Sequence, residues 1–321
     1  MKTISIKDIE GVMIGNAENH EAGTGCTVVL CGKDGACAGL DVRGGGPASR
    51  ESQILNPLAA AERIHAVLLS GGSAFGLEAS NGVQKYLEER GIGVDVCCTK
   101  VPLVCQSCLF DLTVGDPFTR PDIKMGFEAC KGAENMNYQD GNYGAGTGAT
   151  VGKIYGMDYC MKSGIGSYAV QVGELKVGAI AAVNAFGDIY DWKNGKKVAG
   201  LLSEDKKGFR NAETEMIKSY KIINNKFVGN TTLGIIITNA KLEKHNLCKV
   251  ASMAHDGLAR TVRPVHTSVD GDSIYALSVG NVEADQDVVG SLASHVMAEA
   301  ILQGVKTAKS AYGYSAVCDF C

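Results

Sequence analysis

The chain has 321 residues, of which 45% are hydrophobic and 21% charged, the proportions of an ordinary globular protein. Thirty-one basic residues against 35 acidic ones give a formal net charge of -4, which provides no basic field to attract nucleic acid. Glycine, with 41 residues, is well above its typical share of ~7%, but it follows no collagen-like period.

The first 11 residues are polar and charged and lack the apolar core of a secretory signal. No run approaches 18 uninterrupted apolar residues, so no membrane partner is expected. Twelve cysteines are too few for a disulfide scaffold of this length. We therefore expect a cytoplasmic protein whose thiols are reduced.

The elements follow in chain order. The apolar run 64–70 predicts a strand, and two glycines then predict a tight turn. Residues 73–90 predict a helix with Ser73 as its N-cap and Gly91 just beyond its end. Residues 114–148 are the longest loop-like stretch and predict a functional loop. Later segments predict a hairpin of strands at 167–172 and 176–183, strands at 231–238 and 273–279, and helices at 242–260 and 285–309.

These elements mix strands and helices without strict alternation, and hairpin-like pairs stand beside long late helices. This pattern favours a layered α/β fold with largely antiparallel sheets. No internal repeat and no linker rich in proline or serine divides the chain, so we expect a single domain over residues 1–321.

Several candidate cofactor and metal motifs lack the surrounding sequence that such sites require. The glycines of residues 144–149 fit a dinucleotide fingerprint, but the segment before them is polar and not a strand. Cys105 and Cys108, with Cys318 and Cys321, would supply four zinc ligands only if the fold joined them. The six histidines show no metal-binding spacing. We expect no cofactor and no metal, with a cysteine-based metal or redox protein as one alternative.

Residues 227–238 (FVGNTTLGIIIT) hold the motif that indicates chemistry. A glycine and Asn230 precede Thr231, which opens an apolar strand. Cleavage of the Asn230–Thr231 bond would give Thr231 a free α-amine, which titrates near ~7.7–8.0 and can serve as the base for its own hydroxyl. A β-branched residue that merely starts a strand is the alternative.

Seven segments in order resemble the family of L-aminopeptidase/D-esterases, β-peptidyl aminopeptidases and nylon-oligomer endo-hydrolases. They cover most of the chain: residues 23–30 (GTGCTVVL), 40–47 (LDVRGGGP), 71–77 (GGSAFGL), 146–153 (GTGATVGK), 183–185 (VNA), 229–234 (GNTTLG) and 270–277 (DGDSIYAL). The resemblance implies an N-terminal-nucleophile-hydrolase-like α/β/β/α sandwich. It also implies autocleavage into residues 1–230 and 231–321, and a homo-oligomer, a tetramer in the family.

The resemblance also implies roles for single residues. Thr231 matches the nucleophile, and Asn184 matches a side-chain donor to the oxyanion. Lys153 matches a lysine that keeps the amine neutral and stabilises negative charge. Asp270 and Asp272 match paired acids that orient the amine and the hydroxyl, and on a strand they would share one face.

Phe110 falls where some relatives carry a tyrosine near the substrate, so it is a candidate substrate-binding residue that lacks the hydroxyl. The Asn230–Thr231 junction is more similar to the nylon-oligomer hydrolases than to members that cut before serine. The expected activity is hydrolysis of short peptides or linear ω-amino-acid oligomers. Two alternatives stay open: an acyltransferase of the ornithine acetyltransferase type, and a non-catalytic ligand-binding protein on the same fold.

Overall fold

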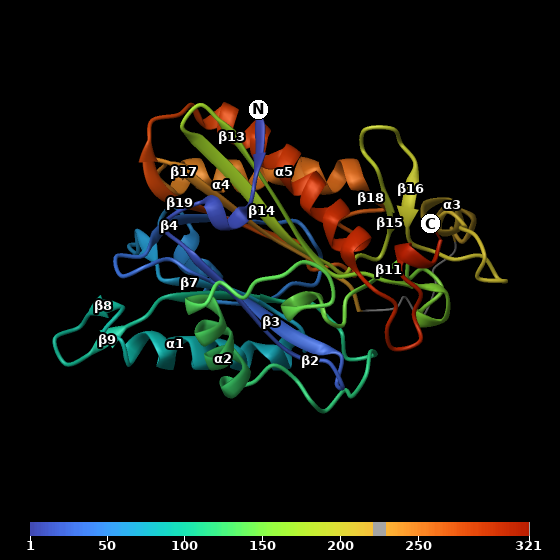
Figure 1. The fold of residues 1–321 in the computed structure, drawn as a ribbon, viewed down its shortest axis with the longest axis horizontal. Coiled ribbons are helices and arrows are strands. Elements are labelled where there is room, and N and C mark those ends of the chain that lie inside the picture. The colour runs from blue at the N-terminus through green and yellow to red at the C-terminus, as the bar shows by residue number, and fades with distance from the viewer. Residues whose placement is uncertain (221–228, 321) are drawn as a thin grey trace.

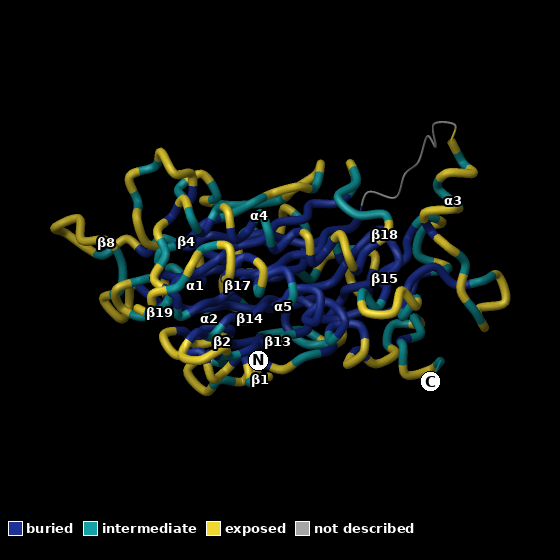
Figure 2. The backbone as a smooth tube through the Cα atoms, turned by 90° about the horizontal axis from the view of Figure 1, so that it is seen from above, coloured by how far each residue is buried: buried dark blue, intermediate teal, exposed yellow. Residues whose placement is uncertain are grey.

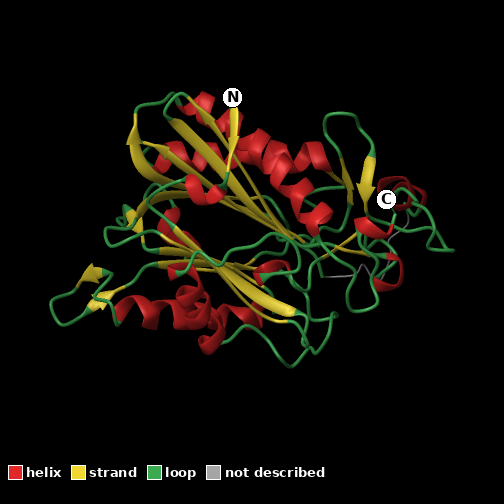
Figure 3. Ribbon diagram, in the orientation of Figure 1, coloured by secondary structure: helices red, strands yellow, loops and turns green. Residues whose placement is uncertain are grey.

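Two β-sheets lie face to face between two layers of helices (Figures 1 and 3). The computed structural model describes residues 1–220 and 229–320. The larger sheet has seven strands, in the order β1 (Lys2–Ile4), β13 (Ile165–Val172), β14 (Leu175–Val183), β17 (Thr232–Ala240), β19 (Ser273–Val282), β4 (Ala36–Val42) and β6 (Arg63–Ile64). The smaller has five, in the order β2 (Met13–Asn19), β3 (Thr24–Leu30), β7 (Ala66–Ser70), β10 (Val104–Cys108) and β5 (Ala48–Arg50).

Both sheets are mainly antiparallel, as the sequence predicts. The exceptions among the described strands are two central parallel pairs, β17 with β19 and β7 with β10. Because β17 and β19 run in the same direction, the segments that precede them meet at one edge of the larger sheet.

Helices close the outer face of each sheet. The helices α4 (Lys244–Thr261) and α5 (Gln286–Thr307) cover the larger sheet, while α1 (Ala79–Glu88) and α2 (Ile123–Glu134) cover the smaller (Figure 1). The helix α5 is long and apolar enough to cross a membrane by composition alone, but 72% of its apolar window is buried inside the fold. Figure 2 shows it within the dark-blue interior.

Three hydrophobic clusters fill the three spaces between the four layers. Alternate side chains of one strand enter different clusters, because successive residues of a strand point to opposite faces. Along β14, Val177, Ala179 and Ala181 pack under α4 and α5, whereas Ile180 and Ala182 face the smaller sheet. This alternation confirms the expected α/β/β/α sandwich.

Smaller elements decorate the sandwich. They are the strand pairs β11 (Thr150–Val151) with β12 (Met161–Lys162) and β8 (Val94–Asp95) with β9 (Lys100–Val101), the three-stranded sheet β16 (Lys197–Ala199), β15 (Asp188–Tyr190) and β18 (Val262–Arg263), the helix α3 (Ala212–Lys218), and 3₁₀ turns at Ile6–Asp8, Ser52–Leu55, Ser73–Glu78, Gly144–Gly146, Met157–Tyr159 and Val317–Asp319.

Two predictions around the first helix were wrong in detail. The run 64–70 is two strands, because the chain leaves the larger sheet after β6 and joins the smaller one at β7. Ser73 is no α-helix N-cap: a 3₁₀ helix comes first, its cap is Gly72, and Ser73 has a φ of 52°. Gly91 does lie just past the end of the helical segment, with a φ of 65°.

The predicted loop at 114–148 was also wrong, because α2 lies inside it. Asp122 caps that helix by accepting from the Met125 N–H at 2.8 Å. Gly126 weakens the helical pattern, yet it is required: a β-carbon there would lie 2.0 Å from the carbonyl oxygen of Ala79 in α1. The glycine that close packing of α1 and α2 requires makes the sequence of α2 look like a loop, so this helix was not predicted.

The later elements agree with the sequence predictions. Strands β13 and β14 form the predicted hairpin, with Val172 opposite Leu175. Strands β17 and β19 and helices α4 and α5 match their predicted ranges to within a few residues. The five strands before residue 51 were not predicted.

Candidate active site

Five of the predicted residues meet at one edge of the larger sheet because of its strand register. Thr231 stands directly before β17, and the pairing of Thr232 with Val183 places Asn184 beside it. On the other side, Leu233 pairs with Ser273, so the segment Asp270–Asp272 also reaches this edge. Sheet topology therefore brings together Asn184 and Asp272, which are 88 positions apart in the sequence.

Thr231 is buried and its backbone is strained. It is 4% exposed, and its φ of 126° lies in a region that β-branched residues rarely adopt. Such a conformation costs on the order of 1–3 kcal/mol and persists only where the surroundings impose it. The junction with Asn230 therefore carries a local conformational cost in the uncleaved chain.

Asp272 is held by groups on three sides. Its Oδ1 accepts from the Thr232 N–H at 2.7 Å, and its Oδ2 lies 2.8 Å from His266 Nδ1. Gly44 lies against its backbone, where a β-carbon would be 2.3 Å from the Asp272 nitrogen. The glycine-rich segment after β4 therefore allows one backbone to pack directly on the other.

Asp270 contacts different partners. Its Oδ1 accepts from the Phe186 N–H at 3.2 Å, and its Oδ2 accepts from the backbone and hydroxyl of Thr267. Burial raises the pKa of the Asp270 carboxyl to about 6, and the neighbouring Asp272 adds to this shift. The two aspartates precede β19 and are not part of it, so the expectation that a strand gives them a common face was wrong.

Lys153 lies wholly inside the protein. Its ammonium donates to Asn184 Oδ1 at 2.8 Å, the Asn184 carbonyl at 3.1 Å and the Gly229 carbonyl at 2.8 Å. Burial lowers the pKa of the Lys153 amine to about 7, against an opposing effect from nearby Asp270. Lys153 thus joins the end of β14 to the residue that precedes Asn230.

Asn184 is buried and uses both ends of its amide. Its Oδ1 accepts from Lys153 and from the Thr150 N–H at 3.0 Å, and its Nδ2 donates to the Phe110 carbonyl at 2.8 Å. The donor end therefore has a fixed direction. In this uncleaved chain it points to Phe110 and not to the carbonyl of Asn230.

A cavity of about 170 Å³ opens beside Thr231. Among the described residues its lining contains no charged side chain; it consists of Gly46, Ala48, Ser73, Cys108, Phe110, Gly229, Asn230, Thr231, Ser268 and Val269. Phe110, the predicted substrate-binding residue, lies in this lining. The space suits a small uncharged group next to the threonine.

Sequence reasoning missed three groups that support this site. His266 contacts Asp272. Lys162 is fully buried and donates to the carbonyls of Gly146 and Ala149, in the segment that precedes Lys153 in the sequence. Burial lowers the pKa of Lys162 to about 7. Asp111 accepts from the Gly72 N–H at 2.7 Å, and burial raises its pKa to about 6. None belongs to a spacing motif, so only the three-dimensional structure finds them.

Among the described residues, the cysteines form no cluster of the kind that the metal-site alternative requires. Cys105 and Cys108 are buried, and burial raises the pKa of Cys108 to about 12, so its thiol stays protonated near neutral pH. Cys318 is exposed, and Cys321 lies outside the described residues. Within 1–220 and 229–320, no three metal-ligating side chains gather.

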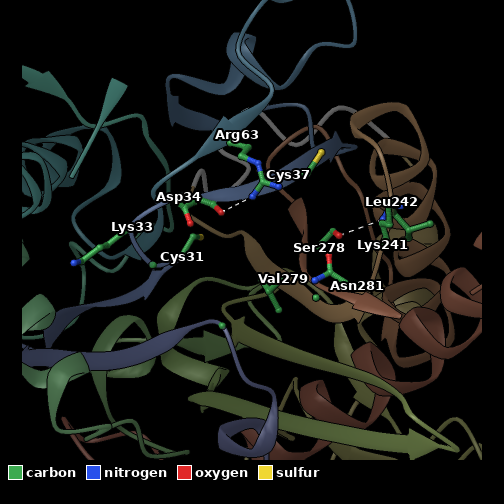
Figure 4. Close-up of a pocket in the computed structure, with 14 residues that line it drawn as sticks. Cys31, Lys33, Asp34, Cys37, Arg63, Lys241, Leu242, Ser278, Val279 and Asn281 are labelled. Carbon is green, nitrogen blue, oxygen red and sulfur yellow. Dashed lines mark hydrogen bonds between the residues drawn. The ribbon is translucent and has the colours of Figure 1, made fainter. Parts of the chain in front are cut away.

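A larger cavity of about 400 Å³ lies at the other end of the same strands (Figure 4). Arg63, Lys241 and Asn281 are among its lining, and Arg63 donates to the Gly35 carbonyl at 2.9 Å. It contains none of the predicted site residues. It is lined by Lys241, which directly follows β17, and by residues 278–281 in the second half of β19.

Comparison with known proteins gives consistent matches. The model of peptidase family S58 matches residues 5–318. The chain is 36% identical to an uncharacterized aminopeptidase of Mycobacterium leprae, over 98% of this chain and 93% of that protein. It is 27% identical to a 6-aminohexanoate-oligomer endohydrolase of Kocuria sp., over 93% of this chain and 85% of that protein.

Solved structures confirm the fold. The L-aminopeptidase D-Ala-esterase/amidase of Ochrobactrum anthropi, described as a variant of the Ntn hydrolase fold, superposes with a TM-score of 0.68 at 16% identity. A β-aminopeptidase of Burkholderia sp. gives 0.66 at 18% identity. Both matches cover 95% of this chain and 86% of the other.

Proposed function

The chain belongs to peptidase family S58 and is a hydrolase of peptide or amide bonds, and we propose that Thr231 is its nucleophile, exposed by self-cleavage. The observation that supports this most strongly is the convergence on the Asn230–Thr231 junction. Lys153 donates to the carbonyl just before Asn230, and Asp272 accepts from the N–H just after Thr231. A single peptide junction is thus held from both sides by buried polar groups.

Self-cleavage begins when the Thr231 hydroxyl oxygen attacks the Asn230 carbonyl carbon. The C–N bond breaks, the nitrogen takes up the hydroxyl proton, and Asn230 becomes esterified to Thr231. Water then hydrolyses that ester, which leaves a carboxylate on Asn230 and a free α-amine on Thr231. Breaking the bond also removes the φ constraint of 126°, so the backbone strain at Thr231 favours the reaction.

In the mature enzyme the α-amine of Thr231 takes the proton from its own hydroxyl as the oxygen attacks a substrate amide. The proton passes to the leaving amine, and the acyl group remains on Thr231 as an ester. Water, activated by the same amine, completes turnover. An α-amine titrates near ~7.7–8.0, so an appreciable fraction is a free base near neutral pH.

The neighbouring groups have separate tasks in this proposal. The Lys153 charge stabilises negative charge on the reacting carbonyl and disfavours a second positive charge on the amine. Asn184 donates to the oxyanion from Nδ2, which must leave the Phe110 carbonyl or be shared with it. Asp270 and Asp272 fix the turn against which the threonine lies.

The two products should remain one fold. Strand β17, which begins directly after Thr231, lies between β14 and β19 in the larger sheet, and its side chains enter two hydrophobic clusters. Removing that strand would expose buried apolar surface, at about 25 cal/mol for each Å². We therefore propose a single domain made of chains 1–230 and 231–321; the tetramer remains a prediction.

The substrate class follows from the relatives and the cavity. The matched relatives include aminopeptidases and hydrolases of 6-aminohexanoate oligomers. The described residues that line the cavity beside Thr231 carry no charge, which favours a small uncharged acyl segment next to the scissile bond. Linear ω-amino-acid oligomers meet that condition, because methylene groups separate their charged amine from the scissile carbonyl. Short peptides with a free N-terminus carry the charged α-amine in the acyl residue itself; they are supported by the aminopeptidase relatives and not by the lining.

Hydrolysis assays with short peptide amides and linear 6-aminohexanoate oligomers test this function, with Thr231→Ala as the inactive control. Mass analysis during turnover should find the acyl group on the peptide that begins at Thr231. Added amine acceptors distinguish the acyltransferase alternative, because a hydrolase should not prefer them to water. Undiminished hydrolysis by Thr231→Ala would exclude the threonine nucleophile.

A further inference from the structure

His266 lies in the loop between β18 and β19, four residues before the segment 270–277 and outside every motif that the sequence offers for the site. Its side chain is 17% exposed, and its Nδ1 lies 2.8 Å from Asp272 Oδ2. The backbone N–H of His266 points to the same oxygen at 3.3 Å. One carboxylate oxygen is therefore bound twice by one residue.

The other oxygen of Asp272 serves the nucleophile strand. Oδ1 accepts from the Thr232 N–H at 2.7 Å, and Thr232 is the first residue of β17. The carboxylate thus bridges His266 and the residue after Thr231. Without the His266 side chain, rotation of the Asp272 carboxylate would be limited by the Thr232 contact and one weak backbone contact.

The histidine itself is held firmly. Its φ of 54° is uncommon for a residue other than glycine, and its ring packs edge-on against His255 of α4, with centroids 4.8 Å apart. Burial lowers the pKa of His255 to about 4, so this neighbour is neutral at pH 7. His255 is in turn fixed at 3.1 Å from the Asp41 carbonyl.

Hydrogen-bond chemistry determines which ring nitrogen carries the proton. A carboxylate only accepts, so His266 Nδ1 must be the donor to Asp272. The other nitrogen, Nε2, is buried and has no hydrogen-bond partner among the described residues. A buried donor without an acceptor is costly, so the Nδ1–H tautomer with Nε2 as acceptor fits this environment.

We propose that His266 is a positioning residue for the reaction, whose Nδ1–H fixes the Asp272 carboxylate against the strand that begins after Thr231. This role rests on the proposed function, because it concerns the same threonine. His266 would not touch the substrate or the reacting atoms. It would act only through the orientation of Asp272.

The test compares His266→Asn with His266→Phe. Asparagine retains a side-chain N–H donor near the place of Nδ1, whereas phenylalanine retains the ring contact with His255 and removes the donor. We expect His266→Phe to slow self-cleavage and to lower kcat of the processed enzyme tenfold or more, with KM within about twofold. His266→Asn should regain most of both rates.

The matched control is His65→Phe, which removes another buried histidine, one that accepts from the Leu103 N–H at 3.0 Å far from Thr231. It should leave both rates unchanged. Where His266→Phe is not recovered folded, His266→Leu replaces it.

Equal losses in the Asn and Phe variants, in step with their melting temperatures, would show a merely structural role and overturn the proposal. Wild-type rates in the Phe variant would overturn it as well. A wild-type chain that never cleaves would instead overturn the proposed function, whatever the His266 variants do.

Discussion

Gly271 lies directly against the side chain of Thr231: a β-carbon built on Gly271 would be 2.7 Å from Thr231 Oγ1. The same β-carbon would be 2.9 Å from the carbonyl oxygen of Gly46. No side chain fits at residue 271 unless the threonine hydroxyl or a backbone segment shifts. Gly271 therefore limits the position of the Thr231 hydroxyl, the proposed nucleophile.

Gly271→Ala should lower the rate of self-cleavage and the amidase rate at least about tenfold, because misplaced reacting atoms lose their attack geometry. Gly208→Ala is the control, since among the described residues its β-carbon would meet only Ser203 Oγ, at 3.6 Å. Time courses of intact mass and of substrate hydrolysis measure both variants. A Gly271→Ala chain that processes at the wild-type rate would contradict this assignment.

Lys153→Met should slow self-cleavage about a hundredfold or more, the loss expected when a preorganised donor to a developing oxyanion is removed. Lys244→Met is a closely matched control. Lys244 is also buried and donates to three carbonyls, those of Ile54, Asn56 and Ala59, but it lies at the start of α4, away from Thr231. Similar slowing in both variants would mean that Lys153 acts only through folding.

Asp270→Asn should change how stability depends on pH, measured in the uncleaved Thr231→Ala background. The folded pKa of Asp270, about 6, lies above its ordinary value of 3.8, so its contribution to stability is present below 3.8 and is lost as pH rises through 6. Asparagine does not titrate. The stability of the variant relative to its parent should therefore rise between pH 4 and pH 7, as followed by urea unfolding.

Asp116→Asn is the control for this pH experiment, because the pKa of Asp116 is shifted in the opposite direction. Asp116 is exposed, and hydrogen bonding from Thr119 lowers its pKa, so its removal should give no rise in relative stability over the same range. If the difference in unfolding free energy between Asp270→Asn and its parent does not change with pH, burial does not raise the pKa of the Asp270 carboxyl.

The sequence named residues that the fold brings together at one edge of the larger sheet, but it predicted less of what surrounds them. Asn184, Thr231 and the aspartates lie at strand ends, and their identities follow from motifs that the family resemblance supplied. His266 and Lys162 were not predicted because their contacts, with Asp272 inside one loop and with the carbonyls of Gly146 and Ala149, follow no recognised motif spacing. The helix α2 escaped because its glycines, needed for close contact with α1, resemble those of a loop.

Close packing also explains part of the high glycine content. At Gly44 and Gly271 a β-carbon would overlap backbone or the threonine hydroxyl, so these glycines allow segments to meet closely around one residue. The dinucleotide fingerprint at residues 144–149 lacks the structure it requires, because residues 144–146 form a short 3₁₀ turn that follows no strand.

Intact-mass measurement of the purified wild-type protein, with N-terminal sequencing and with Thr231→Ala in parallel, tests the central claim most directly. We predict two wild-type chains, residues 1–230 and 231–321, the second beginning with threonine, and a single inactive chain of 321 residues for Thr231→Ala. A wild-type chain that keeps its full mass and still hydrolyses amides would contradict the N-terminal-threonine mechanism.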